Sequence, residues 1–591
     1  MEQTYSERGD KITFFNQTIR KMSFLRKAIL SFSILPLLTL PSCVYEADDS
    51  CPEVISDEVM AYLELTVTTG GNLGTRSNPT GGEIGDGYEH GQGKENAIYD
   101  LNIFLYRDNN NGLDGNYYIR WSKYVDSSMI ETENDNPSYN HDRIYNVKIP
   151  LNKADLEIFR EYAGLPNSCR CIVVANTGDI FSSVAVNQTR TKTIVDNVQY
   201  GKAWIGESTT TADRFVMSPA FNGVIQPDSY IYNEGLINVS TGNDGIVYST
   251  EITLERVAAR IDLQFSNNSS TRDKQEKGWI DIDNQLRYKV KNVEHTLSIS
   301  NIIPVNLMQQ NSYLLKHLSN GDNVDNVLIA ADETLDGQKP TNYVISPCFK
   351  DKSEETTEAI LSNWYGKSSA GFLRKQNNYF FSNQYEISNF GKPIDIPIDS
   401  YDQKTEDKAL IVTYANENTH PEEIQVLENA SDYLTGLLFR AQYHPAKVYT
   451  TGDIGDDAKS EEYVDGNDFW LFRTVGAYNT NIVDEKYNLY FSSEDALNEY
   501  VATLPGEGKY ETVYYPGGIC YYNIWIKHAN IEDSDENFPM KYGIVRNNIY
   551  RIKLSFNGIG QPKPEITEPH NVNTRIYVIK WNFRPQPEII M

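Results

Sequence analysis

Apolar and polar residues alternate with a period of two along much of this chain, which is typical of half-buried strands. The pattern begins at residues 60–69, where Leu63, Leu65 and Val67 alternate with polar residues. One short helix is expected at residues 154–162. Further strands are expected at residues 97–106, 117–124, 144–149, 171–175, 248–265 (at both ends), 295–301, 343–346, 409–414, 437–443, 487–491, 514–525 and 542–556. The pattern therefore predicts an all-β chain with long polar loops and few short helices.

The last alternating run, residues 574–583, follows a segment that is not expected to fold by itself. Four of the first seven residues of segment 558–571 are glycine or proline, so we interpret this segment as an extended tether. A tethered strand either pairs with its own sheet or completes the sheet of another protein. The face of the final strand with the larger side chains carries Tyr577, Ile579, Trp581 and Phe583.

Length and composition indicate more than one β-rich domain. The chain has 591 residues, more than one hydrophobic core normally serves. Aromatic residues make up 12% of it, including 40 tyrosines, which favours strands over helices. We expect domains at residues 77–250 and 251–557, with the boundary near Ser249, and a tether with a final strand at residues 558–591.

Charge and motifs exclude several classes of function. The 53 Lys and Arg residues against 81 Asp and Glu give a net charge of −28, which argues against nucleic acid or anionic lipid as a partner. The sequence has no phosphate-binding loop, metalloprotease motif or nucleophile elbow, and its eight histidines are dispersed. A pair of catalytic carboxylates stays open, because acidic residues are abundant. We predict no catalytic site and no cofactor.

Three segments invite a metal interpretation, and in each the structural interpretation is favoured. Cys169 and Cys171 share one face of a strand, but buried apolar cysteines explain them as well. Residues 108–116 mildly resemble a calcium loop, yet Leu113 stands where the EF-hand needs glycine, so a hairpin turn is favoured. The acidic residues 452–468 are interpreted as a solvated loop. No metal site is predicted.

The N-terminal residues resemble a lipoprotein export signal. Two basic residues precede the apolar residues 28–40, which are too few to span a bilayer. The run ends in the sequence LPSC, whose last residue is Cys43. In such signals the thiol takes a diacylglycerol and cleavage makes the cysteine the first residue. We predict residues 1–42 as leader and signal peptide, starting at Met1 or Met22, and Cys43 as the lipidation site; a plain secretory signal is the alternative.

The loop after the first strand contains a candidate cleavage site. Residues 70–93 include nine glycines and one proline, so we expect them to be mobile and exposed. Arg76 is the only Lys or Arg between Pro52 and Gly93. A single arginine in an exposed loop suits an Arg-specific protease, which would cut between Arg76 and Ser77. The cut would release residues 43–76 with the first strand, whereas the alternative is a plain loop arginine.

Several segments together resemble the fimbrillin superfamily, the type V pilins of Gram-negative anaerobes. Their joint order is most similar to the major structural subunits of short, minor fimbriae. The Arg76 loop lies where that family has its Arg cleavage site. The other segments are ERVAAR at 255–260, LLFRAQYHPA at 437–446, CYYNIWI before the next motif, GIVRNNIY at 543–550 and TRIYVIKWNF at 574–583.

The resemblance implies two transthyretin-like β-sandwich domains and a route of assembly. The precursor is exported as an outer-membrane lipoprotein on Cys43, and an Arg-specific protease cuts after Arg76. The final strand of the next subunit, with its donor residues Tyr577, Ile579, Trp581 and Phe583, then fills the opened groove, which produces an adhesive fimbria on the cell surface. The implied partners are other copies of this chain and the anchor and tip subunits, and the residues identify no receptor.

Three alternatives remain after the sequence. The chain could be a fimbrial anchor or tip subunit, although an anchor needs no tethered final strand. It could be a monomeric, glycan-binding surface lipoprotein whose last strand pairs within its own sheet. An enzyme is the third alternative, and no motif supports it.

Overall fold

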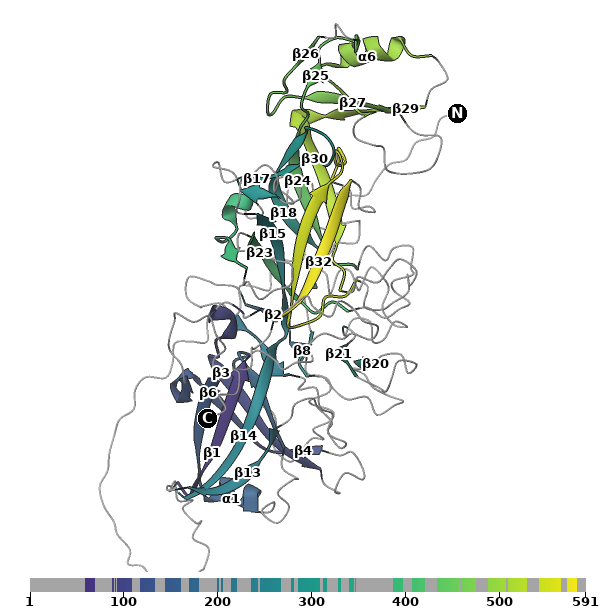
Figure 1. Cartoon of the computed structure of the whole chain (residues 1–591). Helices are drawn as coiled ribbons and strands as arrows, with labels where there is room; N and C mark the ends of the chain where they lie inside the picture. Colours follow the sequence, from purple (N-terminus) through teal and green to yellow (C-terminus); the bar gives the residue numbers. More distant parts are fainter. Residues whose placement is uncertain are drawn as a thin grey trace, which may run out of the picture. The chain divides into compact units, whose positions relative to one another are not determined.

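Strands form most of the regular structure in this computed structural model, so the all-β prediction is confirmed (Figure 1). All described residues lie in one unit, Ser56–Met591. The structure describes residues 59–69, 88–89, 91, 93–108, 117–132, 144–160, 170–179, 199–200, 204–205, 214–220, 235–242, 245–266, 278–280, 285–308, 312–315, 328–330, 340–344, 346, 386–396, 407–419, 433–455, 459–474, 487–505, 509–528, 542–564 and 571–581.

The first sheet has ten strands, and the strand that begins the described chain lies inside it. Its main order is β4-β3-β7-β11-β14-β1-β6-β5, with β12 beside β7 and β13 beside β14. The strands are β1 (Ala61–Thr69), β3 (Asp100–Asp108), β4 (Tyr117–Asp126), β5 (Ile130–Thr132), β6 (Ile144–Leu151), β7 (Arg170–Ala175), β11 (Met217–Pro219), β12 (Gly235–Leu236), β13 (Asn238–Gly242) and β14 (Gly245–Arg256).

Alternation along β1 places its apolar side chains in the first core. Leu63, Leu65 and Val67 are buried, and the residues between them are half-buried. The same apolar cluster contains Ile103 of β3 and Val173 of β7, which lie several strands away in the sheet. The sheet therefore curves so that both of its halves cover one core.

The second sheet has eleven strands and includes the end of the described chain. Its main order is β2-β32-β31-β15-β16-β17-β18-β24-β30, with β23 beside β15 and β22 beside β23. The strands are β2 (Tyr88–Glu89), β15 (Ala258–Ser266), β16 (Trp279–Ile280), β17 (Leu286–Lys289), β18 (Thr296–Val305), β22 (Ile394–Asp395), β23 (Asp407–Asn416), β24 (Gly436–His444), β30 (Ile519–Trp525), β31 (Asn548–Phe556) and β32 (Val572–Trp581).

The chain passes between the two sheets at Val257, where β14 ends and β15 begins. The expected strand at residues 248–265 is thus two strands in two sheets, and the predicted boundary near Ser249 lies within β14. The expected strand at residues 542–556 begins later, at Asn548, because the chain turns at Asn547, which has a φ of 55°.

A smaller five-stranded sheet lies between β24 and β30 in the sequence, and the alternating pattern predicted only its strand at residues 487–491 and the end of β29. Its order is β26-β25-β28-β27-β29, and α6 (Glu494–Ala502) packs on it through Ala496 and Leu497. Ser493 caps α6 by accepting a hydrogen bond from the Ala496 amide at 3.1 Å. Its strands are β25 (Val448–Tyr449), β26 (Ser460–Glu461), β27 (Phe469–Thr474), β28 (Leu489–Phe491) and β29 (Tyr510–Tyr515).

The remaining elements are short. The helix α1 (Lys153–Arg160) begins with a reciprocal pair of hydrogen bonds, each 3.0 Å long, between Asn152 and Asp155. No helix in the described part of the chain has the length and apolar character needed to cross a membrane. The other elements are β8 (Gln199–Tyr200) with β19 (Ser312–Tyr313), β9 (Trp204–Ile205) with β10 (Arg214–Phe215), β20 (Leu328–Ala330) with β21 (Pro340–Val344), η1 (Gly93–Asn96), η2 (Ser127–Met129), η6 (Ile387–Asn389) and η9 (Pro516–Gly518).

The stability of the second sheet is expected to depend on pH through His295. Its Nδ1 accepts a hydrogen bond from the Ala446 amide at 2.8 Å, and burial lowers the pKa of His295 to about 4. The folded chain therefore binds fewer protons than the unfolded chain between pH 6.5 and 4, so stability falls as the pH falls through that window. Between pH 7.5 and 5 this residue should remove about 1–2 kcal/mol from the free energy of unfolding.

The variant His295→Asn keeps a hydrogen-bond acceptor but does not titrate. Urea denaturation at both pH values should show a smaller pH dependence in the variant than in the unchanged chain. An equal loss of stability in both proteins would contradict the assignment to His295.

Candidate functional site

The first strand occupies a slot between two long neighbours. β1 pairs in parallel with β14 from Ala61 to Thr69 and antiparallel with β6 from Ala61 to Thr68. Thr68 Oγ1 also donates to Thr253 Oγ1 of β14 at 3.0 Å. Without β1, both neighbours would carry unpaired backbone groups and Leu63 and Leu65 would be missing from the first core.

The last strand has only one long neighbour. β32 pairs antiparallel with β31 from Val572 to Lys580, whereas β2 pairs with it only at Lys580 and Trp581. Val572 and Ile576 are buried in the second core. The positions predicted to form the donor face alternate with these two. In the β31–β32 register Tyr577 lies opposite Arg551, Ile579 opposite Ile549, and Trp581 opposite Glu89 of β2, whereas Phe583 lies outside the described residues.

The expectation that residues 70–93 are all mobile and exposed is wrong at their end. Tyr88 and Glu89 form β2, and the Glu89 side chain is only 2% exposed. Its carboxylate accepts hydrogen bonds from two arginines of the second sheet, Arg260 and Arg551. These ion pairs order a segment that has too few apolar residues to order itself. We call residues 88–89, 91 and 93–96 the clasp.

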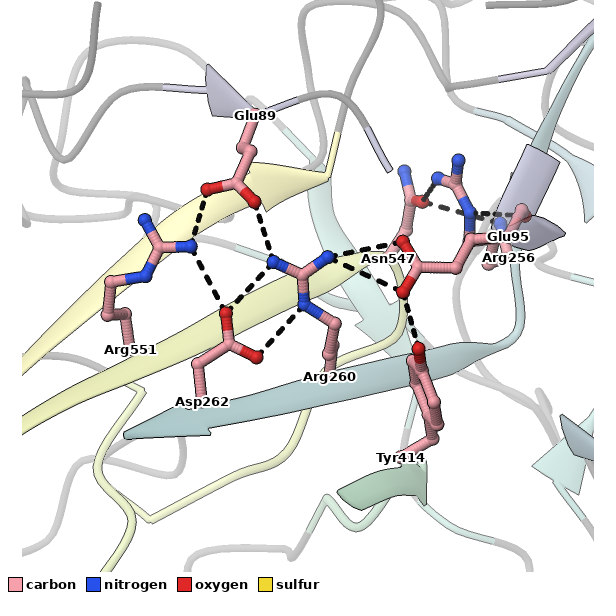
Figure 2. Close-up of polar contacts among 8 residues, drawn as sticks. All are labelled: Glu89, Glu95, Arg256, Arg260, Asp262, Tyr414, Asn547 and Arg551. Carbon is pink, nitrogen blue, oxygen red and sulfur yellow. Dashed lines mark hydrogen bonds and ion pairs between the residues drawn. The ribbon is translucent and has the colours of Figure 1, made fainter. Parts of the chain in front are cut away.

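Arg260 lies at the centre of a buried cluster of charges (Figure 2). Its guanidinium donates to Glu89 Oε1 at 2.6 Å, to Glu95 Oε2 at 3.1 Å and to Asp262 Oδ2 at 2.9 Å. Arg551 joins the cluster by donating to Asp262 Oδ2 at 3.1 Å. Two of the three carboxylates therefore come from the clasp, and the third comes from the strand that carries Arg260.

Electrostatics keep these buried groups charged. Burial acts to raise the pKa of Glu89, but the guanidiniums of Arg551 and Arg260 outweigh it and hold that pKa below its usual value. Burial likewise acts to lower the pKa of Arg260, and the three carboxylates raise it well above its usual value. Burial and the neighbouring Glu95 carboxylate raise the pKa of Tyr414, whose hydroxyl donates to that carboxylate.

Several predicted site residues lie outside the described residues. These are the lipidation site Cys43 and the cleavage site Arg76–Ser77. Cys169, which was interpreted as a buried apolar cysteine, also lies outside the described residues, and Cys171 is buried in β7. Among the residues that the structure describes, no group of three His, Cys, Asp or Glu side chains could hold a metal ion. The distinctive parts of this region are one strand with long neighbours on both sides, one strand with a long neighbour on one side only, and a clasp that contacts both regions.

The alternating pattern does not reveal the clasp, although one signal of it is present in the sequence. Arg256 and Arg260 interrupt an otherwise strand-like run, and charged residues at buried strand positions require partners. The sequence could not supply the partners, because Glu89 and Glu95 lie more than 160 positions away from Arg260.

Comparisons with known proteins point to one family. Residues 513–586, which include β30, β31 and β32, match the family described as "Major fimbrial subunit protein type IV, Fimbrillin, C-terminal". No curated protein sequence matches the chain.

Three solved structures resemble the chain at low sequence identity and low TM-score. A Bacteroides eggerthii protein proposed to act in cell adhesion has 11% identity and a TM-score of 0.30, covering 89% of this chain and 98% of its own. A fimbrilin (FimA) from Porphyromonas gingivalis has 13% identity and a TM-score of 0.29, covering 90% and 99%. The fimbrial anchor protein Mfa2 from Porphyromonas gingivalis has 8% identity and a TM-score of 0.16, covering 50% and 86%. These TM-scores are too low to support a family assignment, which therefore rests on the match of residues 513–586.

Replacing Arg260 should destabilise the chain strongly. In Arg260→Met the free energy of unfolding is expected to fall by about 3–5 kcal/mol at pH 7, because three buried carboxylates lose a shared partner. Urea denaturation measures the loss. Arg473→Met is the control, since Arg473 pairs with the half-exposed Glu511 at 2.7 Å and should lose less than about 1 kcal/mol. Equal losses of unfolding free energy in Arg260→Met and Arg473→Met would show that the buried charge cluster does not stabilise the chain.

Proposed function

The chain belongs to the fimbrillin superfamily by its C-terminal region, residues 513–586, and we propose that it is a structural subunit of a fimbria that assembles by donor-strand exchange. In this proposal β1 is a temporary occupant of the first sheet. The tail strand β32 of another copy replaces β1, and each subunit both receives and donates a strand. The role is structural and not enzymatic.

One observation carries the proposal, namely the unequal pairing of the two strands. β1 has long neighbours on both sides, whereas β32 has one long neighbour and the two-residue β2. A tail strand that moves from its own sheet into a vacated slot loses one long ladder of backbone hydrogen bonds and gains two. Each additional backbone hydrogen bond contributes about 0.5–1.5 kcal/mol net.

Side-chain burial adds to this preference. The slot accepts apolar side chains at the positions of Leu63, Leu65 and Val67, and each such side chain contributes about 1.5–3 kcal/mol when fully buried. Departure of β32 uncovers Val572 and Ile576 in the second core, which opposes the exchange. The four large residues Tyr577, Ile579, Trp581 and Phe583 exceed those two in apolar area, so the balance favours the slot.

Proteolysis would control the exchange. We propose that the precursor is exported as an outer-membrane lipoprotein on Cys43 and that an Arg-specific protease cuts between Arg76 and Ser77. Residues 43–76 then leave with β1. The contact is head-to-tail and does not close on itself, so repetition gives a filament. The partners are other copies of this chain on the cell surface, with anchor and tip subunits at the ends.

Assembly should require cleavage at Arg76. When protein consisting of residues 43–591 is treated with trypsin under native conditions, it should lose the segment before Ser77 and form a ladder of species that resist SDS without boiling. Arg76→Gln is the matched control and should stay monomeric under the same treatment. A chain that is cut at Arg76 and remains a monomer would instead support the monomeric surface lipoprotein.

The tail should act through one particular face. Replacing Tyr577, Ile579, Trp581 and Phe583 together by Asn should abolish the ladder after cleavage, because the slot would receive no apolar side chains. The control replaces Val572 and Ile576 by Thr, and it should still give ladders. If the opposite face entered the slot, the Val572 and Ile576 variant would lose the ladder and the fourfold Asn variant would keep it. Ladders from a chain lacking residues 571–591 would exclude the tail as the donor.

A further inference from the structure

The C-terminal end of the clasp is held by the three strands that define the slot. The backbone carbonyl of Asn96 accepts hydrogen bonds from Thr69 Oγ1 of β1 at 3.4 Å and from the Tyr145 hydroxyl of β6 at 2.9 Å. The carbonyl of Glu95 accepts a hydrogen bond from Arg256 Nε of β14 at 2.9 Å. These donors belong to β1 and to the two strands that pair with it. The clasp is therefore attached to β1 itself and to both strands that β1 joins.

The N-terminal end of the clasp holds the tail strand. Tyr88 and Glu89 of β2 pair with Lys580 and Trp581, so β32 lies between β31 and β2. Glu89 fixes β2 in this place because Arg260 and Arg551 both donate to its carboxylate. The end of β32 cannot separate from β31 as a free edge while β2 covers it.

We propose that the clasp is a lock that keeps β32 in its own sheet while β1 fills the slot and that opens when β1 departs. Departure of β1 removes Thr69 and leaves Tyr145 and Arg256 on strands without their shared neighbour. The clasp then keeps only the contacts from two strands that are no longer joined through β1, so its attachment to the first sheet weakens and β2 withdraws from β32. The lock itself is a property of the single chain, and only its use in assembly rests on the proposed function.

The charged cluster makes this lock a two-state element. Among the described residues Arg551 has no hydrogen-bond partner for Nε or Nη1, so Glu89 and Asp262 are the partners of its guanidinium. Partial withdrawal of Glu89 would leave buried charges with fewer partners, which is strongly unfavourable. The clasp is therefore either fully bound with its charges paired, or withdrawn with the cluster open to water. A coupling between two regions requires such an element.

Hydrogen exchange in the uncut full chain tests the lock directly. In Glu89→Gln the amides of β32 should exchange at least about tenfold faster than in the unchanged chain, because local opening becomes easier. Glu417→Gln is the matched control. It also removes the charge of a buried carboxylate, which accepts from Arg546 at 2.6 Å, but Glu417 belongs to neither the clasp nor β32. In this control the ratio of exchange in β32 to exchange in β24 should not change.

A second variant tests the long-range connection. Tyr145→Phe, in a strand of the first sheet, keeps the buried ring but loses the hydroxyl, which donates to the Asn96 carbonyl and accepts from the Ile98 amide at 3.0 Å. Exchange in β32 should rise about fivefold in the uncut chain, because the hydrogen bond to Asn96, which contributes about 1 kcal/mol, is the one of the two that attaches the clasp. Cleavage of the unchanged chain at Arg76, measured on the cut monomer before any assembly protects β32 in another copy, should raise exchange in β32 at least to the level of Glu89→Gln.

The possible results separate the lock from the proposed function. If neither Glu89→Gln nor cleavage changes exchange in β32 relative to β24, the lock is excluded, whether or not ladders form. If cleavage speeds exchange in β32 and Glu89→Gln does the same, the lock is supported. If the lock is supported but cut subunits form no ladder, the donor-strand proposal fails on its own.

Discussion

Burial of Arg260 is the constraint on which the junction of the two sheets depends. A guanidinium without exposure to water needs carboxylate partners, and two of the three, Glu89 and Glu95, lie in the clasp. The clasp must therefore cross from the first sheet to the second at the position of Arg260. A buried ion cluster of this kind adds less to stability than an apolar core would, and its main effect here is to specify one path for the chain.

The pairing of β1 bears on how a foreign strand would enter. β1 is parallel to β14 and antiparallel to β6, so an incoming strand meets one parallel and one antiparallel neighbour in either direction. Backbone hydrogen bonding then provides little discrimination between the two directions. The choice depends on the order of large and small side chains along the donor and on where its tether is attached.

The sequence predicted both strands but not their neighbours. Alternation is a local property, so residues 60–69 and 574–583 were recognised and overlap closely with β1 and β32. The clasp was missed because its order comes from arginines far away in the sequence, and local composition around Glu89 indicated only flexibility. Most of the five-stranded sheet, apart from β28, was missed for another reason. Its strands are short and lie between polar loops, although Ser493 followed by two acidic residues is a recognisable start of α6.

The tether limits where a donated strand can be inserted. Residues 558–561, which were expected to belong to an extended tether, are held by β29 and β30. Tyr522 of β30 and Tyr515 of β29 donate to the carbonyls of Gly558 and Gly560 at 2.9 Å, and Gln561 pairs with Tyr521 of β30. A departing tail would therefore be anchored at Gln561. Residues 562–571 could span at most about 35 Å when fully extended. The slot of the receiving copy must begin within that distance of β30, which requires direct contact between successive subunits and excludes a loosely linked chain of them.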